Sequence, residues 1–235
     1  MLDIDVGNTR IKWRIAPSCH GDAPDPVHLI EQIKPSLNHV SRIRIVSVAS
    51  EQANHVLAEQ LKRATELEAE FAVVSPGCGG LVCGYQDYHR LGVDRWAAVC
   101  AAWHECQSSC IVVDAGTAVT VDVVDDNGQH LGGYIAPGLT MAQDVLLKKT
   151  HGIEFDHRQP TLEPGRDTAT AVGGGVLLSI LGMIERTVTQ STESLGVRPT
   201  IYLTGGNSDL LRGYLQLDMV YKPFLVLDGL KYLLP

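Results

Sequence analysis

The feature that most constrains the fold of this chain is a pattern that occurs twice. An apolar segment, residues 2–6, carries Asp5 and runs into Gly7-Asn8-Thr9, and residues 10–15 then alternate between apolar and basic side chains. Residues 110–124 repeat this order, with Asp114, a Gly-Thr turn and a second alternating segment. Alternation of this kind predicts half-buried strands, so each copy is expected to form a β-hairpin with an acidic residue near its turn. The repeat predicts a duplicated α/β fold with halves 1–108 and 109–235, and a cleft between them where Asp5 and Asp114 face each other.

Other segments carry weaker but consistent signals. Hydrophobic periodicity and turn residues predict further strands and helices between the repeated hairpins. A positive φ is expected at Gly7-Asn8, because both residue types tolerate it. Residues 17–28 are expected to form a surface connection. The expected strands are 42–50, 71–75 and 200–206, and the expected helices are 51–70 (with Val56, Leu57, Leu61, Ala64 and Leu67 on its buried face), 95–106, 138–149, 167–195 and 207–216.

Composition excludes some classes of partner. The 235 residues carry a formal net charge of −8 at pH 7, so no surplus of Lys and Arg is available to neutralise nucleic acid or an anionic membrane surface. A small anionic ligand needs only local donors and stays possible. The N-terminus lacks a signal-peptide pattern, and no long uninterrupted apolar run predicts a membrane span. The six cysteines form no C-x-x-C pair, which favours reduced thiols, a cytoplasmic location and no zinc site at Cys78 and Cys83.

Two carboxylates that converge on a cleft repel each other, so a positive group is expected beside them. A magnesium ion carrying the phosphates of ATP meets this need, because Mg²⁺ takes one or two carboxylates plus phosphate oxygens. Backbone amides at the glycines and the side chains of Asn8, Thr9, Lys12 and Thr117 could contact those phosphates. Gly205-Gly206, at the end of a predicted strand, could admit a flat adenine or ribose. No Walker A pattern occurs, and the plain alternative is that each Asp-x-Gly is ordinary turn chemistry.

Longer motifs in a fixed order favour a functional interpretation. These are DVGNTRIK (5–12), LGVDRWAA (91–98), DAGTAVTVDVVDDNGQHLGGYIAPGL (114–139), DTATAVGGG (167–175) and LTGG (203–206). Together they span nearly the whole chain, which resembles the actin-like ATPase and sugar-kinase superfamily and, more narrowly, the type III pantothenate kinases. The resemblance implies an actin-like ATPase (ribonuclease H-like) fold with a central nucleotide cleft. It also implies a homodimer that transfers a phosphoryl group from ATP to pantothenate, forming 4'-phosphopantothenate in the first step of coenzyme A synthesis.

The resemblance also assigns roles. Asp94 matches the general base that accepts the hydroxyl proton, although an Asp at this place could instead be the N-cap of the helix that follows. Asp114 matches a ligand of a monovalent cation, K⁺ or NH₄⁺, and Asp5 could hold Mg²⁺ through water. The implied pantothenate contacts are Tyr85, Gly92, Val93, Asp94, Arg95 and Thr168, and the implied ATP contacts are Asp5, Val6, Gly7, Asn8, Thr9, Arg10, Ile11, Lys12, Thr117, Gly205 and Gly206.

Some positions stay open. Tyr88 stands where the family usually has proline, so the loop around Tyr85 could differ in shape. Thr168 could cap a helix rather than contact substrate. His130 and the other histidines lack metal-ligand spacing and are expected to be structural or solvated. Seven apolar residues suit either a core or a dimer interface: Trp103, Val145, Leu146, Val176, Leu177, Ile180 and Met183.

Two other functions remain possible from sequence. The chain could be another kinase or phosphatase of the same superfamily, acting on a different small molecule. It could also be a nucleotide-binding regulatory protein without turnover. The Asp94-Arg95 pair favours pantothenate phosphorylation over another reaction of the superfamily, because a general ATPase core does not require it. The presence of Asp94, Asp5 and Asp114 together argues against a protein without turnover.

Overall fold

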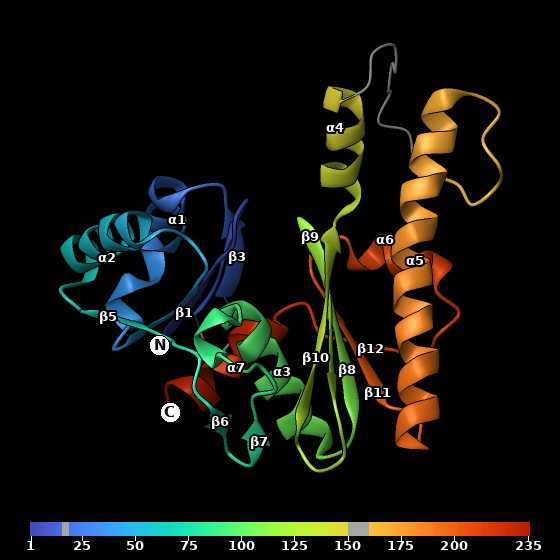
Figure 1. Cartoon of the computed structure of the whole chain (residues 1–235). Helices are drawn as coiled ribbons and strands as arrows, with labels where there is room; N and C mark the ends of the chain where they lie inside the picture. The colour runs from blue at the N-terminus through green and yellow to red at the C-terminus, as the bar shows by residue number, and fades with distance from the viewer. Residues whose placement is uncertain (16–18, 150–159) are drawn as a thin grey trace. The chain divides into compact units, whose positions relative to one another are not determined.

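The computed structural model describes residues 1–15, 19–149 and 160–235, which form two compact units (Figure 1). The first unit comprises Met1–Gln107, Gly128–His130 and Phe224–Pro235, and the second comprises Ser108–Asn127 and Leu131–Pro223. The C-terminal segment therefore belongs to the first unit. The predicted division into functional halves at 108/109 stays a prediction.

The first unit contains a five-stranded sheet in the order β3-β2-β1-β4-β5. Its strands are β1 (Leu2–Val6), β2 (Ile11–Ile15), β3 (Cys19–Ala23), β4 (Ile43–Ser47) and β5 (Ala69–Phe71). β1 pairs antiparallel with β2 and parallel with β4. The predicted N-terminal hairpin is therefore confirmed, with Asp5 directly opposite Lys12. Directly opposite residues on paired strands share a face of the sheet, so these two side chains lie on the same side.

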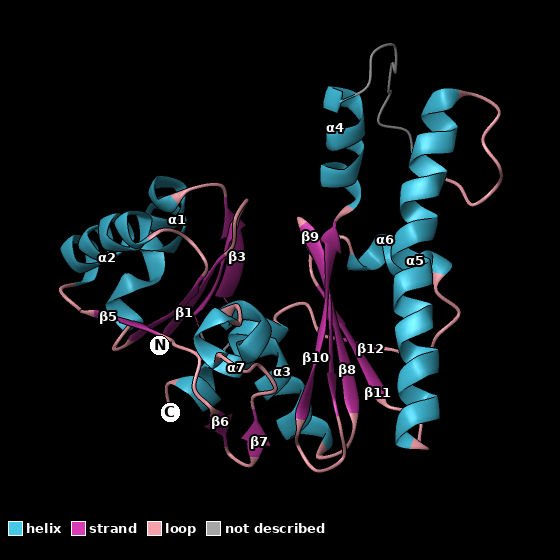
Figure 2. Ribbon diagram, viewed as in Figure 1, coloured by secondary structure: helices cyan, strands magenta, loops and turns pink. Residues whose placement is uncertain are grey.

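Helices cover both faces of this sheet (Figure 2). On one face, α1 (Pro26–Ile33) and α2 (Glu51–Thr65) pack their buried Leu29 and Leu57 against the apolar side of β1. On the other face, α7 (Leu225–Leu233) contacts β1 and β4, and α3 (Val93–Cys106) packs closely on α7. The remaining elements are the 3₁₀ helices η1 (Lys34–His39) and η2 (Tyr88–Arg90) and the hairpin of β6 (Gly77–Cys78) and β7 (Leu81–Val82).

The second unit repeats the strand order, β10-β9-β8-β11-β12. Its strands are β8 (Cys110–Ala115), β9 (Ala118–Val124), β10 (His130–Pro137, whose first residue belongs to the first unit), β11 (Thr200–Thr204) and β12 (Val220–Tyr221). β8 pairs antiparallel with β9 and parallel with β11, as β1 does with β2 and β4. Because both sheets place the acidic hairpin beside a parallel strand in the same order, the duplicated α/β fold is confirmed.

Among its described residues the second unit contains three helices: α4 (Leu139–Lys149), α5 (Thr168–Leu195) and α6 (Ser208–Tyr214). The long helix α5 begins after the N-cap Asp167, whose side chain forms a capping box with Thr170. Its buried side chains, such as Leu177 and Ile184, join the core of the unit. By length and composition alone α5 could also cross a membrane, which qualifies the expectation of no span; one such helix is weak evidence, because core helices meet the same criterion.

Several sequence predictions need correction. The helix predicted over 51–70 ends at Thr65, because Glu66 takes a left-handed conformation with φ of 61° and the chain turns toward β5. Val56, placed on the buried face of that helix, is 46% exposed. β5 ends at Phe71, so the strand predicted over 71–75 is shifted. The supposed surface connection 17–28, whose first two residues lie outside the described part of the chain, contains β3 and the start of α1.

The predicted positive φ at Gly7-Asn8 is also wrong, since neither residue has one. The loop between β1 and β2 is longer than a two-residue turn. It is closed by a hydrogen bond of 3.1 Å from the backbone N–H of Gly7 to the carbonyl oxygen of Arg10. The extra length removes the need for a left-handed residue.

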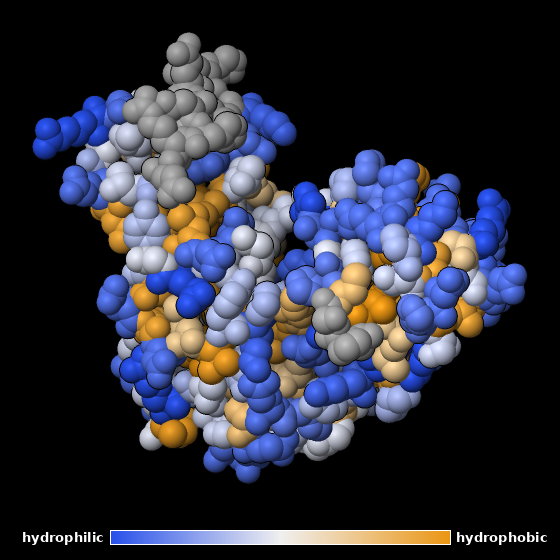
Figure 3. All heavy atoms as spheres, turned by 180° about the vertical axis from the view of Figure 1, so that it is seen from behind, coloured by the Kyte–Doolittle hydropathy of each residue, from blue (hydrophilic) through white to orange (hydrophobic). Residues whose placement is uncertain are grey.

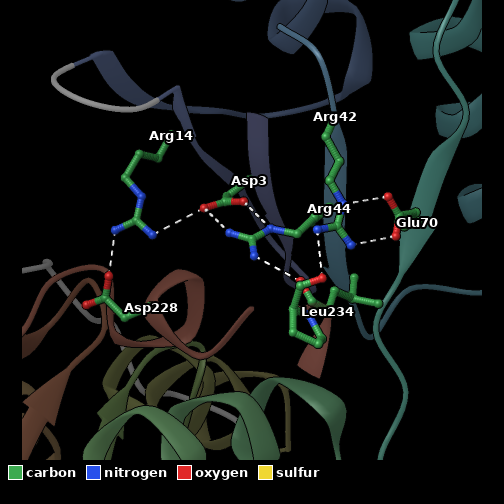
Figure 4. Close-up of polar contacts among 8 residues, drawn as sticks. Asp3, Arg14, Arg42, Arg44, Glu70, Asp228 and Leu234 are labelled. Carbon is green, nitrogen blue, oxygen red and sulfur yellow. Dashed lines mark hydrogen bonds and ion pairs between the residues drawn. The ribbon is translucent and has the colours of Figure 1, made fainter. Parts of the chain in front are cut away.

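A buried ion network joins the first sheet to the end of the chain (Figure 4). Asp3 is 5% exposed and accepts hydrogen bonds from Nε and Nη2 of Arg44 at 2.9 and 3.2 Å. Arg14 donates to Asp3 at 3.3 Å and to Asp228 of α7 at 2.6 Å. Arg44 also donates to the carbonyl oxygen of Leu234 at 3.0 Å. These contacts attach α7 to the face of β1 that carries Asp3 and Asp5.

We expect Asp3→Asn to lower the free energy of unfolding of the first unit by about 3 kcal/mol, because Arg44 would keep a buried charge without its carboxylate. Urea denaturation measures this change. Glu70→Gln is the matched control, since Glu70 binds Arg42 in an exposed pair worth about 1 kcal/mol or less. Equal losses in the two variants would contradict a special role for the buried pair.

Candidate functional site

In the first unit, Asp5 lies near the carboxyl end of β1, half-buried, on the sheet face that α7 covers. Its neighbours Leu2, Ile4 and Val6 point to the opposite, apolar face, because side chains alternate along a strand. In the loop that follows, Asn8 is exposed, whereas the backbone N–H of Gly7 is already hydrogen-bonded to the carbonyl oxygen of Arg10. The loop thus places polar groups beside the Asp5 carboxylate. The N–H of Gly7, however, is not available to a phosphate as the sequence had suggested.

Of the other residues predicted to contact ATP in this hairpin, two are engaged elsewhere or buried. Arg10 forms an ion pair with Asp22 of the neighbouring strand β3, with both side chains about half exposed. Ile11 is buried in the core. Lys12 is half-buried opposite Asp5, so its ammonium group and the Asp5 carboxylate share one face of the sheet.

The second group of predicted residues lies at the start of α3. Gly92 is the N-cap, Val93 is the first helical residue, and Asp94 is the second. The alternative that Asp94 is the N-cap is therefore wrong. One carboxylate oxygen of Asp94, Oδ1, accepts a hydrogen bond of 2.7 Å from the backbone N–H of Arg95. A Cβ at position 92 would lie 2.6 Å from that oxygen, so glycine makes room for the carboxylate. A carboxylate in the first turn is stabilised by the helix dipole.

Arg95 is held rather than free in solvent. It is 7% exposed, and its Nη1 donates a hydrogen bond of 2.8 Å to the hydroxyl oxygen of Tyr85. The guanidinium carbon also lies 5.7 Å from the centroid of the Tyr85 ring. This contact brings the predicted residues Tyr85, Asp94 and Arg95 together, and Tyr88 in place of proline does not prevent it. A buried guanidinium fork of this kind suits a carboxylate ligand.

His130 has a structural place, as one of its two expected roles, but its position beside Tyr85 was not predicted from the sequence. It is fully buried, and its ring lies parallel to Tyr85 at an angle of 9° with the centroids 6.1 Å apart. Its Nδ1 accepts a hydrogen bond of 3.4 Å from the backbone N–H of Gly84. His130 thus supports both the Tyr85 ring and the loop before it. His130 lies in the motif 114–139, but no local pattern links position 130 to position 85.

In the second unit, Asp114 lies near the carboxyl end of β8, half-buried and beside the turn at Gly116-Thr117. Gly205 takes a φ of +98°, and a Cβ there would lie 2.4 Å from Oδ1 of Asp114. Only glycine allows this close approach with this backbone conformation. The backbone of Gly205, directly after β11, therefore lies against the Asp114 carboxylate within this unit, a contact that the sequence did not indicate.

Backbone hydrogen bonds tie three loops together around Asp114. The N–H of Gly138 donates to the carbonyl oxygen of Thr117 at 2.9 Å, and the N–H of Asn207 donates to that of Ala115 at 2.9 Å. The side-chain amide of Asn207 donates to Gly116 at 3.3 Å. Sequence reasoning missed Gly138 and Asn207. A signal was available for Gly138, because this glycine is the first residue of the helix predicted over 138–149.

Two further predicted residues, Gly206 and Thr168, are exposed, as is Thr9 in the loop between β1 and β2. A Cβ on Gly206 would meet nothing within 4 Å, so packing within the protein does not explain a glycine there. Thr168 is the first residue of α5 and follows the N-cap Asp167, so Thr168 is not the helix cap. Neither position conflicts with contact to a ligand.

The acidic side chains of the candidate site suit a magnesium ion that takes a single carboxylate ligand. Among the described residues, no group of three or more His, Cys, Asp or Glu side chains is placed to hold a metal ion. Mg²⁺ usually keeps several waters and takes one or two carboxylates with substrate phosphates, so a single carboxylate such as Asp5 suffices for it. When bound, Mg²⁺ would offset the negative charge of a polyphosphate.

Solved structures with a similar fold support the architecture. A protein from Campylobacter jejuni, titled a conserved putative Baf family transcriptional activator, aligns with a TM-score of 0.63 and 22% identity over 98% of this chain and 96% of that chain. A structure of the PilM–PilN type IV pilus biogenesis complex aligns with a TM-score of 0.50 and 12% identity over 100% of this chain and 98% of that chain. At these identities the likeness concerns the fold, which is the duplicated actin-like ATPase (ribonuclease H-like) type.

Sequence comparisons identify the family. The family model for type III pantothenate kinase matches residues 1–190. A type III pantothenate kinase of Ectopseudomonas mendocina is 39% identical over 100% of this chain and 99% of its own length. That of Cellvibrio japonicus is 36% identical over 98% of this chain and 95% of its own length. With Gly92, Asp94 and Arg95 placed together at one helix start, these matches show that the chain belongs to the type III pantothenate kinase family.

Proposed function

We propose that this chain transfers the γ-phosphoryl group of ATP to the primary hydroxyl of pantothenate, with Asp94 as the general base. The product would be 4'-phosphopantothenate, formed in the first step of coenzyme A synthesis. The observation that carries the proposal is the start of α3, where Asp94 stands beside the buried Arg95 in a chain of this family. Phosphoryl transfer requires mainly positioning and charge stabilisation, together with a group that accepts the hydroxyl proton.

The geometry of α3 supports the role of Asp94. The hydrogen bond from the N–H of Arg95 fixes the orientation of the carboxylate and favours its ionised form. An ionised carboxylate can accept the hydroxyl proton as the oxygen attacks phosphorus. Arg95, held by Tyr85, would bind the carboxylate of pantothenate, and Gly92, Val93 and Thr168 would complete the contacts.

For ATP, we propose contacts from both acidic hairpins. In the first unit these are Asp5 and the loop that follows, with Asp5 holding Mg²⁺ through water. In the second unit they are Thr117, Gly205 and Gly206, with Asp114 beside a monovalent cation. The close fit of Gly205 around Asp114 and the unexplained glycine at position 206 support this assignment.

An assay of ADP release over a panel of small hydroxy acids tests the function. We expect turnover with pantothenate, and faster turnover in potassium or ammonium than in sodium buffer. Preference for a sugar or another acid would favour a different kinase of the superfamily. Binding of ATP without turnover on any acceptor would favour the regulatory alternative.

We expect Asp94→Asn to lower kcat at least tenfold, or about 1.4 kcal/mol of transition-state stabilisation, because an amide cannot accept the proton. Single-turnover measurements with saturating ATP and pantothenate give this rate. Asp87→Asn is the matched control, because Asp87 is exposed and caps only the short helix η2. A mutant at position 94 with the rate of the wild type would remove Asp94 from the role of base.

We expect Tyr85→Phe to raise KM for pantothenate about tenfold and to leave KM for ATP within twofold of wild type. The change removes the hydroxyl that holds Arg95, and a hydrogen bond to a charged group contributes about 1.5–3 kcal/mol. Steady-state kinetics with each substrate varied separates the two constants. Tyr88→Phe serves as the control in the same loop, and an equal rise there would contradict a specific role for the Tyr85 hydroxyl.

We also propose that the chain is a cytoplasmic homodimer that pairs through its second unit. Apolar side chains are exposed on β10 and α4, including Ile135 at 63% and Val145 at 51%, and Leu178 of α5 is exposed at 61%. Figure 3 shows hydrophobic residues at the molecular surface on the side opposite to Figure 1. Of the residues that suited either a core or an interface, Val176, Leu177 and Ile180 are core, whereas Val145 and Leu146 are exposed.

Sedimentation equilibrium tests this proposal. We expect a dimer for the wild type and a weakened dimer for Ile135→Glu, because a carboxylate would be buried without a partner. Val27→Glu, at an exposed apolar site of the first unit, is the control and should stay dimeric. A monomeric wild type at micromolar concentration would contradict the proposal.

A further inference from the structure

A short segment at the start of β10, Gly128 to His130, has no part in the reaction proposed above. It lies in the first unit, although the rest of β10 belongs to the second. The backbone N–H of Val82 in β7 donates a hydrogen bond of 2.8 Å to the carbonyl oxygen of Gly128, and Val82 and Gln129 form a parallel bridge. The segment therefore runs beside the part of the chain that leads to Tyr85.

Close packing fixes the position of this segment. Gly128 has a φ of +79°, and a Cβ there would lie 2.8 Å from the carbonyl oxygen of Gly80 and 2.7 Å from the Trp103 ring of α3. No side chain fits at position 128, so the backbone lies directly against the turn between β6 and β7 and against α3. His130, two residues further on, is held in place relative to both.

His130 supports the Tyr85 ring from the interior of the first unit. The His130 side chain is fully buried, whereas Tyr85 is partly exposed. The two rings are nearly parallel, at 9°, with their centroids 6.1 Å apart. The ring of Trp96, which follows Arg95 on α3, lies 6.3 Å from the His130 ring. His130 thus packs beside both the tyrosine and the helix that carries the arginine.

A hydrogen bond extends this support to the loop backbone. The N–H of Gly84 donates to Nδ1 of His130 at 3.4 Å. Gly84 directly precedes Tyr85, whose hydroxyl oxygen accepts the hydrogen bond of 2.8 Å from Nη1 of Arg95. Because the position of this hydroxyl depends on the loop, His130 acts on the guanidinium of Arg95 through Gly84 and Tyr85.

We propose that His130 is a positioning residue for the carboxylate of the acceptor. It holds the Tyr85 hydroxyl where the Arg95 guanidinium keeps the orientation that binds a carboxylate. A guanidinium binds a carboxylate through two N–H groups only when its plane is correctly turned. The inference rests on the proposed function, in which pantothenate supplies that carboxylate. Loss of His130 weakens pantothenate binding and leaves proton transfer to Asp94 intact.

Steady-state kinetics of His130→Phe tests the proposal. Phenylalanine keeps a planar ring beside Tyr85 but cannot accept the hydrogen bond from Gly84. We expect KM for pantothenate to rise about fivefold, the size expected for one neutral hydrogen bond, while kcat and KM for ATP stay within about twofold of wild type. His130→Asn, whose Oδ1 can accept in place of Nδ1, should bring KM for pantothenate back to within about twofold of wild type.

A double-mutant cycle separates positioning through Tyr85 from a general effect on the fold. Adding His130→Phe to Tyr85→Phe should change KM for pantothenate by less than about twofold, because the contact that His130 supports is already lost. His89→Phe is the matched control, since the His89 ring lies against Tyr88 in the same loop with the centroids 4.0 Å apart. We expect this control to keep the KM of the wild type.

The same cycle with His130→Leu, which also lacks an acceptor, gives the test should phenylalanine prevent folding. An unchanged KM for pantothenate in these variants, a KM in His130→Asn as high as in His130→Phe, or independent effects of His130 and Tyr85 would each overturn this proposal alone. A wild type that does not phosphorylate pantothenate would overturn the proposed function as well, so the two failures are distinguishable.

Discussion

Close packing of α7 on α3 is the constraint on which the first unit depends. A Cβ on Gly229 would lie 2.1 Å from the carbonyl oxygen of Ala97, so the two helices approach each other backbone to backbone. α7 also contacts β1 and β4, and its Asp228 binds Arg14. The last segment of the chain therefore fixes α3, whose first turn carries Asp94 and Arg95, over the sheet that carries Asp5. Small residues at a helix contact allow this approach without loss of packing density.

The two sheets share one geometry, although different roles are proposed for them. Each places a carboxylate near the carboxyl end of the first strand of a hairpin, next to a parallel strand. In the second unit the parallel strand ends in Gly205, whose backbone fits against Asp114. In the first unit the corresponding strand is β4, and the residues proposed to contact substrate come instead from α3. The repeat thus explains the two proposed phosphate contacts, while the proposed substrate contacts near Arg95 are specific to one copy.

The sequence allowed prediction of the hairpins, because apolar alternation and Asp-Gly turns are local signals. It missed β3, since His20, Gly21 and Asp22 give no alternating apolar pattern. It placed the end of α2 too late, because the left-handed residue there is Glu66 rather than a glycine. The return of α7 to the first unit could not be predicted, because it depends on contacts between residues at opposite ends of the chain.

The candidate site shows the same division between local signals, which the sequence carries, and contacts between distant residues, which it does not. Asp94 and Arg95 were recognised from a motif, but the N-cap proved to be Gly92, a residue with no side-chain acceptor. The hydrogen bond between Arg95 and Tyr85 and the support from His130 are tertiary contacts without a local pattern.

A crystal structure of the protein with pantothenate and a non-hydrolysable ATP analogue would test the proposed chemistry most directly. If Asp94 takes the proton, the primary hydroxyl of pantothenate should lie about 2.6–3.2 Å from an oxygen of its carboxylate. The pantothenate carboxylate should then contact Arg95. A hydroxyl bound away from the start of α3, with Asp94 and Arg95 contacting only protein, would contradict it.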